Sequence, residues 1–348
     1  MKFIVTLIML TAQISLFAQN KKSIVLKHEF IFSKAPFAQC HASSIEATKK
    51  GLVAAWFGGT KERNPDVEIY VSRNTKGKWT YPISVANGIQ QSGERYPCWN
   101  PVLYQIPGGN LILFYKVGPS PQTWWGEMKV SADDGVTWGD AKRLPENILG
   151  PIKNKPVLLN NGDLLCPAST EITKNSGWKM HFEITRDFGK TWEISANIDS
   201  GSKYNAIQQS VLKHGGNKLQ ILARSKDDGI VSSWSNDNGK TWSKIEKTGL
   251  KNPNSGTDAV TLKDGRHLLI YNNSDKPEGK WSGKRTPLNL AISSDGINWK
   301  DIAVLESDPG EYSYPAIIQD KEGKVHITYT WRRENIKYAL IDISKIKK

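Results

Sequence analysis

The chain has 348 residues, of which 38% are hydrophobic and 9% aromatic, and it contains 13 tryptophans. This composition indicates a packed core and excludes an intrinsically disordered chain. The formal net charge is +13. Because no nucleic-acid-binding motif, basic helix or block of basic residues accompanies that charge, an acidic oligosaccharide or polysaccharide is the expected partner and a nucleic acid is not.

The N-terminus has the pattern of a secretory signal peptide. Lys2 gives a basic start, Phe3–Leu10 is a short apolar run, and Ala18 ends a stretch of smaller residues. The apolar run is too short for a membrane anchor, which is the alternative interpretation. We therefore expect residues 1–18 to be removed and residues 19–348 to form a single catalytic domain in a periplasmic or secreted protein with no membrane span.

The cysteine content argues against a disulfide framework or a zinc site. Cys40, Cys98 and Cys166 are the three cysteines, so one disulfide at most can form and at least one thiol stays free. No CxxC or Cys/His ligand cluster appears. We expect no metal and no organic cofactor, and we expect a monomer.

A repeated motif with the pattern S/T-x-D-x-G-x-T-W runs through the chain. Full copies are SADDGVTW from Ser131, TRDFGKTW from Thr185 and SNDNGKTW from Ser235, with a shorter copy, SSDGINW, from Ser293 and a degenerate one, SRNTKGKW, from Ser72. The closing tryptophans are 59, 54, 50 and 57 residues apart. Such a period predicts repeats of one supersecondary unit.

Each copy has the chemistry of a structural turn. The aspartate accepts hydrogen bonds from backbone N–H groups of its own turn, the glycine supplies a positive φ, and the tryptophan packs between neighbouring sheets. Short β-type runs such as NLILFYKV and KLQILARS lie between the copies. The pattern predicts an all-β, six-bladed β-propeller of four-stranded antiparallel blades, in which a strand near residues 23–32 closes the ring against the last blade.

The repeats resemble the Asp-box (BNR-repeat) members of the sialidase superfamily, and the resemblance covers essentially all of residues 19–348. It implies a funnel where the first residues of the innermost strands meet, and three arginines that bind a substrate carboxylate. Arg224 in KLQILARS and Arg285 in KRTPLNLAIS match two of them, whereas His41 in CHASSI stands where the first arginine is expected.

The same resemblance implies a tyrosine nucleophile, a glutamate that activates it and an acid/base aspartate. Tyr314 in GEYSYPAIIQ matches the tyrosine, with Tyr312 two residues away on the same strand face, and Gln209 replaces the glutamate. Asp66 in KERNPDVEIY matches the aspartate, with Glu62 as its neighbour.

Blade symmetry predicts further binding residues at the funnel mouth. Asn100 precedes an inner strand in YPCWNPVLYQ, and Lys153 and Asn154 lie at the corresponding point of GPIKNKPVLL. Trp124 in SPQTWWGEMK can stack on a sugar ring, although tryptophans of this kind more often pack within a blade.

Three functions fit this set of residues. Arginines that neutralise a uronate carboxylate acidify its C5 proton, and a Tyr314/His41 pair can then exchange protons, so we expect β-elimination to a 4,5-unsaturated uronate by a dehydratase or lyase. The first alternative is a sialidase-type exo-glycosidase in which Tyr314 is the nucleophile. The second is a carbohydrate-binding propeller without turnover.

Overall fold

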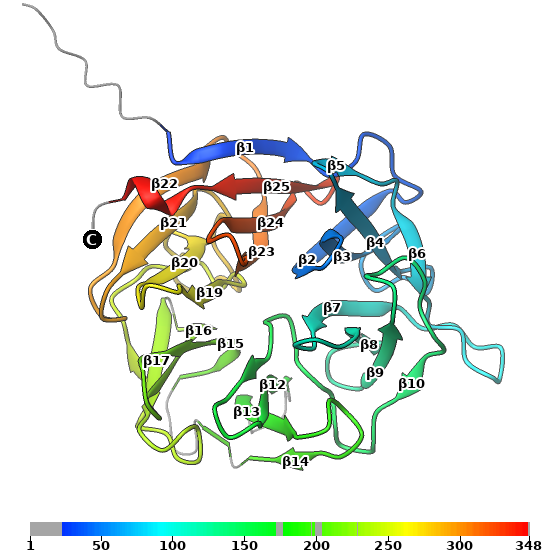
Figure 1. Ribbon diagram of the computed structural model, residues 1–348, viewed down its shortest axis with the longest axis horizontal. Helices are drawn as coiled ribbons and strands as arrows, with labels where there is room; N and C mark the ends of the chain where they lie inside the picture. Colours follow the sequence, from blue (N-terminus) through cyan, green and yellow to red (C-terminus); the bar gives the residue numbers. More distant parts are fainter. Residues whose placement is uncertain (1–22, 172–176, 196, 199–203, 228, 347–348) are drawn as a thin grey trace, which may run out of the picture.

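The computed structural model describes residues 23–171, 177–195, 197–198, 204–227 and 229–346. The predicted signal peptide lies outside these residues. The described chain forms six antiparallel sheets around a central axis, and Figure 1 shows the ring that they make. The predicted all-β, six-bladed propeller is therefore confirmed.

Each blade has four main strands, and the first strand of each blade lies nearest the axis. Blades 1 and 2 contain β2 (Gln39–Thr48), β3 (Gly51–Gly59), β4 (Glu68–Thr75), β5 (Lys78–Trp79) with the extra β6 (Ile83–Ala86), and then β7 (Cys98–Gln105), β8 (Leu111–Val117), β9 (Trp125–Ser131) and β10 (Lys142–Arg143). Blades 3 and 4 contain β11 (Val157–Leu158), β12 (Leu164–Glu171), β13 (Trp178–Thr185), β14 (Glu193–Ile194), β15 (Ala206–Lys213), β16 (Leu219–Ser225), β17 (Ile230–Ser235) and β18 (Glu246–Lys247).

Blades 5 and 6 complete the ring. They contain β19 (Asp258–Thr261), β20 (His267–Asn272), β21 (Leu288–Ser293), β22 (Lys300–Glu306), β23 (Tyr312–Gln319), β24 (Val325–Trp331), β25 (Asn335–Ile341) and, from the other end of the chain, β1 (Val25–Phe30). A 3₁₀ turn at Ile343–Lys345 follows. Because β1 pairs with β25, the sheet of blade 6 is built from both ends of the chain, as the sequence predicted.

The core consists of apolar layers between neighbouring blades. Phe57 of blade 1 packs in one buried cluster with Leu113 and Tyr115 of blade 2. In the next interfaces, Trp192 meets Phe114 edge-on at 6.1 Å and Trp242 stacks on Phe182 at 5.3 Å. The repeat tryptophans therefore pack between sheets, where the motif predicted them.

Polar contacts near the axis tie the inner strands together. Lys155 of blade 3 donates to both carboxylate oxygens of Asp258 of blade 5, at 2.9 and 2.8 Å. Asp258 also accepts a hydrogen bond from Ser210 of blade 4 and one from the backbone N–H of Ile317 of blade 6. One buried carboxylate thus connects four blades, which fixes the positions of the inner strands relative to each other.

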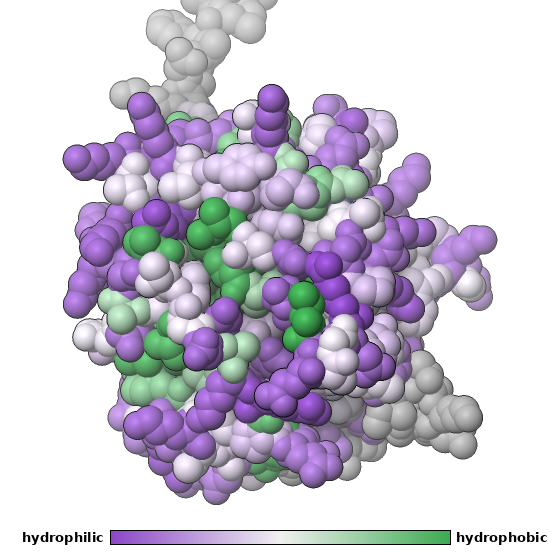
Figure 2. All heavy atoms as spheres, turned by 90° about the vertical axis from the view of Figure 1, so that its right-hand side faces the viewer, coloured by the Kyte–Doolittle hydropathy of each residue, from purple (hydrophilic) through white to green (hydrophobic). Residues whose placement is uncertain are grey.

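One side of the propeller has a mainly polar surface (Figure 2). Figure 2 shows that the side bearing β4, β6 and β10 is largely hydrophilic, with apolar side chains in small separate groups. Among the described residues, no helix has the length and hydrophobicity needed to cross a membrane.

The Asp-box aspartates act in the turns between the third and fourth strands. Asp237 accepts hydrogen bonds from the Thr241 backbone N–H at 2.9 Å, from the Thr241 hydroxyl at 2.5 Å and from the Ser235 hydroxyl at 2.8 Å. The hydrogen bond from the Thr241 side chain is the largest cause that lowers the pKa of Asp237, to about 2. Asp133, Asp187 and Asp295 make the same kind of turn.

Asp237→Ala should lower the free energy of unfolding by about 1 kcal/mol, since a partly exposed turn loses its hydrogen bonds. The folded-state pKa lies below the unfolded value, so this contribution is present above pH 3.8 and is lost as the pH falls toward 2. Thermal unfolding of Asp237→Ala and the wild type should therefore differ at pH 7 and converge in acid. Asn236→Ala, at an exposed position of the same turn, is the control; equal effects of both variants would contradict the structural role.

Candidate functional site

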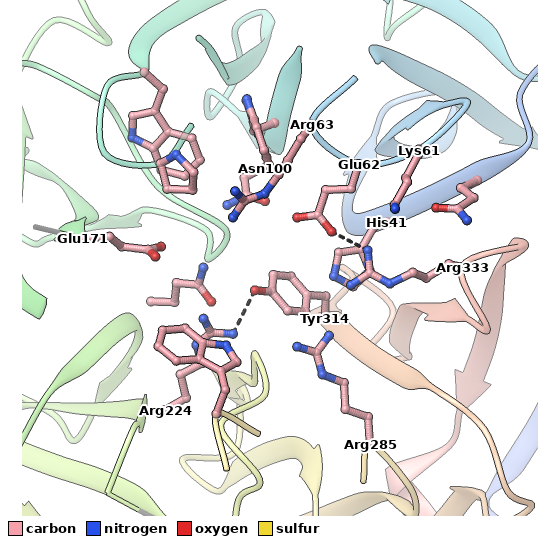
Figure 3. Close-up of a pocket in the computed structure, with 16 residues that line it drawn as sticks. His41, Lys61, Glu62, Arg63, Asn100, Glu171, Arg224, Arg285, Tyr314 and Arg333 are labelled. Atoms are coloured by element: carbon pink, nitrogen blue, oxygen red, sulfur yellow. Dashed lines mark hydrogen bonds and ion pairs between the residues drawn. The ribbon is translucent and has the colours of Figure 1, made fainter. Parts of the chain in front are cut away.

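A cavity of about 530 Å³ opens at one end of the propeller axis. Seven charged side chains line it: Lys61, Glu62, Arg63, Glu171, Arg224, Arg285 and Arg333. Tyr314 stands at its centre in Figure 3, with the arginines around it. Five of these groups are cations and two are anions, so the cavity attracts a negatively charged ligand.

A backbone conformation that recurs in every blade directs side chains of the inner strands into this cavity. Each blade has one non-glycine residue with positive φ at or just before its inner strand: Ala42, Asn100, Lys153, Gln208, Asn254 and Tyr314. In four blades the pairing register shifts at this point, which is the signature of a β-bulge. The bulges turn Asn100, Gln208 and Tyr314 into the cavity wall.

The Tyr314 ring is surrounded by cations and an imidazole. Its hydroxyl accepts a hydrogen bond from Arg224 Nη1 at 2.8 Å. The Arg224 and Arg285 guanidinium carbons both lie 5.5 Å from the ring centroid. The His41 ring lies 4.2 Å from it, tilted by 48°. A guanidinium at the phenolic oxygen stabilises negative charge there.

His41 packs directly beside Tyr314. It is 3% exposed, and its Nδ1 is 3.0 Å from the Thr330 hydroxyl. Burial is the main cause that lowers the pKa of His41 well below its usual value, and Arg333, Arg285, Arg224 and Lys153 act in the same direction. The imidazole is therefore neutral near pH 7, and it contacts the face of the phenol ring.

Two further arginines line the cavity, Arg63 and Arg333, to which the sequence analysis assigned no role. Arg333 follows β24, and its Nε donates to both oxygens of Glu311 at 3.2 and 3.1 Å. Arg285 Nη1 donates to the same carboxylate at 2.8 Å. Burial alone would raise the pKa of Glu311, but Arg285 and Arg333 outweigh it and the pKa is lowered. Glu311 thus holds two guanidinium groups side by side.

The carboxylates that line the cavity differ in part from those that the sequence predicted. Asp66 does not line the cavity, because its oxygens accept hydrogen bonds from the Thr60 backbone N–H at 2.7 Å and the Thr60 hydroxyl at 2.9 Å. Its neighbour Glu62 does line the cavity, where it pairs with Arg333. Glu171, at the end of β12, is a second cavity carboxyl that the sequence analysis missed, because no motif marks the end of an adjacent strand.

Four other predicted binding residues lie behind the cavity wall. Gln209 is fully buried and donates to the carbonyls of Ala168 and His181, while its neighbour Gln208 reaches the cavity. Tyr312 is 1% exposed and belongs to an apolar cluster, so it is not the hydrogen-bond partner of Tyr314. Lys153 donates to the Thr257 and Pro315 carbonyls, and Asn154 to the Gln208 carbonyl.

The remaining predictions agree with the cavity lining. Asn100 and Trp124 are both buried for the most part and both contribute to the wall. Trp124 packs edge-on against Trp99 at 6.0 Å, so it serves the blade as well as the cavity. Within the described ranges, no group of three His, Cys, Asp or Glu side chains is arranged to hold a metal ion.

Comparisons with known proteins match this architecture. A family model described as a BNR repeat-like domain matches residues 50–327. No curated protein matches this chain. Among solved structures, a protein of unknown function from Dyadobacter fermentans DSM 18053 superposes with a TM-score of 0.74 at 19% identity, covering 91% of this chain and 98% of that one.

Two sialidase-type structures are also similar. The Hadza microbial sialidase Hz136 has a TM-score of 0.74 at 17% identity, covering 89% of this chain and 67% of its own. The leech intramolecular trans-sialidase, complexed with 2,7-anhydro-Neu5Ac, has a TM-score of 0.71 at 14% identity, covering 92% and 71%. At these identities the likeness establishes the fold. With the family model matching most of its length, the chain belongs to the BNR repeat-like domain family and is a sialidase-like β-propeller.

Proposed function

We propose that this protein is a carbohydrate-active enzyme that hydrolyses the terminal acidic sugar from an oligosaccharide. The observation that carries the proposal is the Tyr314 hydroxyl, held by Arg224 on the floor of a cavity that also contains Arg285 and Arg333. The similarity of the fold to sialidases supports hydrolysis better than the β-elimination that the sequence analysis favoured.

The arginines suit a sugar carboxylate. Guanidinium groups bind carboxylates through two parallel hydrogen bonds. Arg224 is 5% exposed, and its Nε has no hydrogen-bond partner among the described residues. Glu311 and Glu62 occupy the other sides of Arg285 and Arg333 and hold them in place. The cavity volume lies within the ~300–1,000 Å³ of small-molecule sites, which favours attack on a chain end.

Tyr314 suits the nucleophilic role on an anionic sugar. A phenol carries no charge until its proton leaves, so it can approach an anion without repulsion. Arg224 then stabilises the phenolate. Neutral His41 fills the space against the ring and keeps its orientation. Tyrosine nucleophiles are an established variant of glycoside hydrolysis.

β-Elimination is the second candidate, and one observation favours it. Gln209 replaces the activating glutamate that the family resemblance implies and lies behind the wall, and the neighbouring amide of Gln208, which lines the cavity, cannot take the Tyr314 proton. In elimination the Tyr314 phenolate would remove the C5 proton of a uronate instead of attacking the anomeric carbon. A propeller that binds acidic sugars without turnover is the third candidate.

One assay separates these candidates. The protein is incubated with oligosaccharides that end in glucuronate, iduronate or N-acetylneuraminate, and products are followed by ultraviolet absorbance and mass spectrometry. Release of the intact acidic sugar with flat absorbance is the expected result. A rise in absorbance from a 4,5-unsaturated uronate would replace hydrolysis by elimination, and binding without any product would replace catalysis by recognition.

We also propose that the protein acts outside the cytoplasm as a monomer. The proposal rests on the predicted signal peptide in residues 1–18 and on the acidic polysaccharides expected as partners there. The net charge of +13 favours association with such polymers.

Tyr314→Phe should lower kcat by at least about 10³-fold, because the nucleophile is lost while the ring and its cation contacts remain. Tyr312→Phe is the matched control, since Tyr312 is buried and, among the described residues, its hydroxyl accepts just one hydrogen bond, from Arg332 at 3.4 Å. Its kcat should stay within about threefold of wild type. Comparable losses in both variants, with unchanged thermal unfolding, would remove Tyr314 from the reaction.

Arg333→Gln should raise the Kd for D-glucuronate or N-acetylneuraminate at least about tenfold, which is 1.4 kcal/mol. The neighbouring Arg332 is exposed and bonds to the Pro309 carbonyl, so Arg332→Gln should leave Kd within about twofold. Isothermal titration calorimetry measures both. If Arg333→Gln binds as tightly as wild type, Arg333 is not part of the carboxylate clamp.

A further inference from the structure

Glu171 is a cavity carboxyl with no direct partner among the described residues. It ends β12 and lines the same cavity as Tyr314, and Figure 3 shows its carboxyl group directed into the cavity on the side toward which the Tyr314 hydroxyl points. Within the described part of the chain, no side chain or backbone group donates a hydrogen bond to it or forms an ion pair with it. A half-buried carboxyl in that situation is available to a ligand.

The other carboxylates around the cavity are engaged. Glu62 pairs with Arg333, and Glu311 pairs with both Arg285 and Arg333. These ion pairs keep Glu62 and Glu311 in the ionised form and hold them against guanidinium groups. Glu171 is therefore the carboxyl of this set that can carry a proton and present it to a bound sugar.

The charges that face Glu171 come from two neighbouring segments. Arg224 and Lys226 belong to β16 and the residues after it, and Arg63 and Glu62 belong to the loop between β3 and β4. Burial is the main cause that raises the pKa of Glu171, and Glu62 adds to this rise. The positive charges of Arg224, Lys226 and Arg63 oppose it, but the net effect is a raised pKa. A raised pKa suits a general acid near neutral pH.

We infer that Glu171 is the proton donor to the glycosidic oxygen that leaves the acidic sugar. This inference rests on the proposed function and names a catalytic residue for it. Glu171 comes from blade 3, whereas the acid/base expected from the family resemblance comes from the loop of blade 1 that holds Asp66. The cavity places the sugar between the Glu171 carboxyl and the Tyr314 hydroxyl.

The reaction balances with these two groups. The Tyr314 phenolate, having given its proton to solvent and held by Arg224, attacks the anomeric carbon. The bond between that carbon and the leaving oxygen breaks, its electron pair stays on the oxygen, and Glu171 gives this oxygen a proton. The Glu171 carboxylate then takes a proton from water, and the resulting hydroxide attacks the anomeric carbon. The bond between that carbon and the Tyr314 oxygen breaks, and its electron pair returns to the phenolate.

The test compares two substrates that share one acidic sugar and differ in the leaving group. A nitrophenyl group leaves without protonation, whereas a second sugar needs a proton on its oxygen. Glu171→Gln should lose about 10²–10³-fold in kcat/KM on the disaccharide and less than about tenfold on the nitrophenyl glycoside. The fall in wild-type disaccharide activity as the pH rises and Glu171 loses its proton should also disappear in this variant.

Glu62→Gln is the matched variant, because it removes the other carboxylate that lines the cavity. It should lower the activity on both substrates to the same extent, since it releases Arg333 from its ion pair. Equal losses on both substrates for Glu171→Gln, or selective loss in Glu62→Gln, would overturn the inference. Tyr314→Phe distinguishes a failure of the proposed function from a failure of the role of Glu171. Activity in that variant overturns the proposed function. If Tyr314→Phe is inactive but the loss in Glu171→Gln does not depend on the leaving group, only the role of Glu171 is overturned.

Discussion

The cavity depends on one backbone feature, the positive φ at the start of each inner strand. A non-glycine residue in this conformation costs about 1–2 kcal/mol, and the chain adopts it in all six blades. Contacts such as the bonds of Lys153 to the Thr257 and Pro315 carbonyls hold the inner strands in place around these bulges. Because of this conformation, the side chains of Asn100, Gln208 and Tyr314 point out of the sheet and into the cavity.

The second constraint is the placement of charge. Clustered guanidinium groups repel each other unless anions separate them, and Glu311 and Glu62 meet this need for Arg285 and Arg333. These carboxylates come from the segment before β23 and the loop after β3, whereas Arg285 comes from blade 5 and Arg333 from blade 6. The arginines are therefore held by contacts between neighbouring blades.

A common fold can support different chemistry when a few residues move between strands. Arg333, one of four arginines that line the cavity, comes from the turn after β24, whereas His41, at a position where the sialidase resemblance implies an arginine, is neutral. Gln209, which replaces the implied glutamate, is buried behind the wall, whereas the amide of Gln208 and the Glu171 carboxyl of blade 3 line the cavity. Several residues that line the cavity therefore come from strand ends and loops that no motif marks, which is why motif matching alone did not locate them.

The sequence by itself determined the propeller, the number of blades and the closure by the N-terminal strand, because Asp-box turns and alternating strands are local patterns. It also located Tyr314 and Arg224, which lie on β23 and β16, and Arg285, which lies in the segment before β21. Only the tertiary structure separated Gln208 from Gln209 and Tyr314 from Tyr312, since a β-bulge shifts the side-chain alternation by one residue. It alone brought Arg333 and Glu171 to the cavity, because contacts between the ends of strands in different blades leave no periodic signal in the chain.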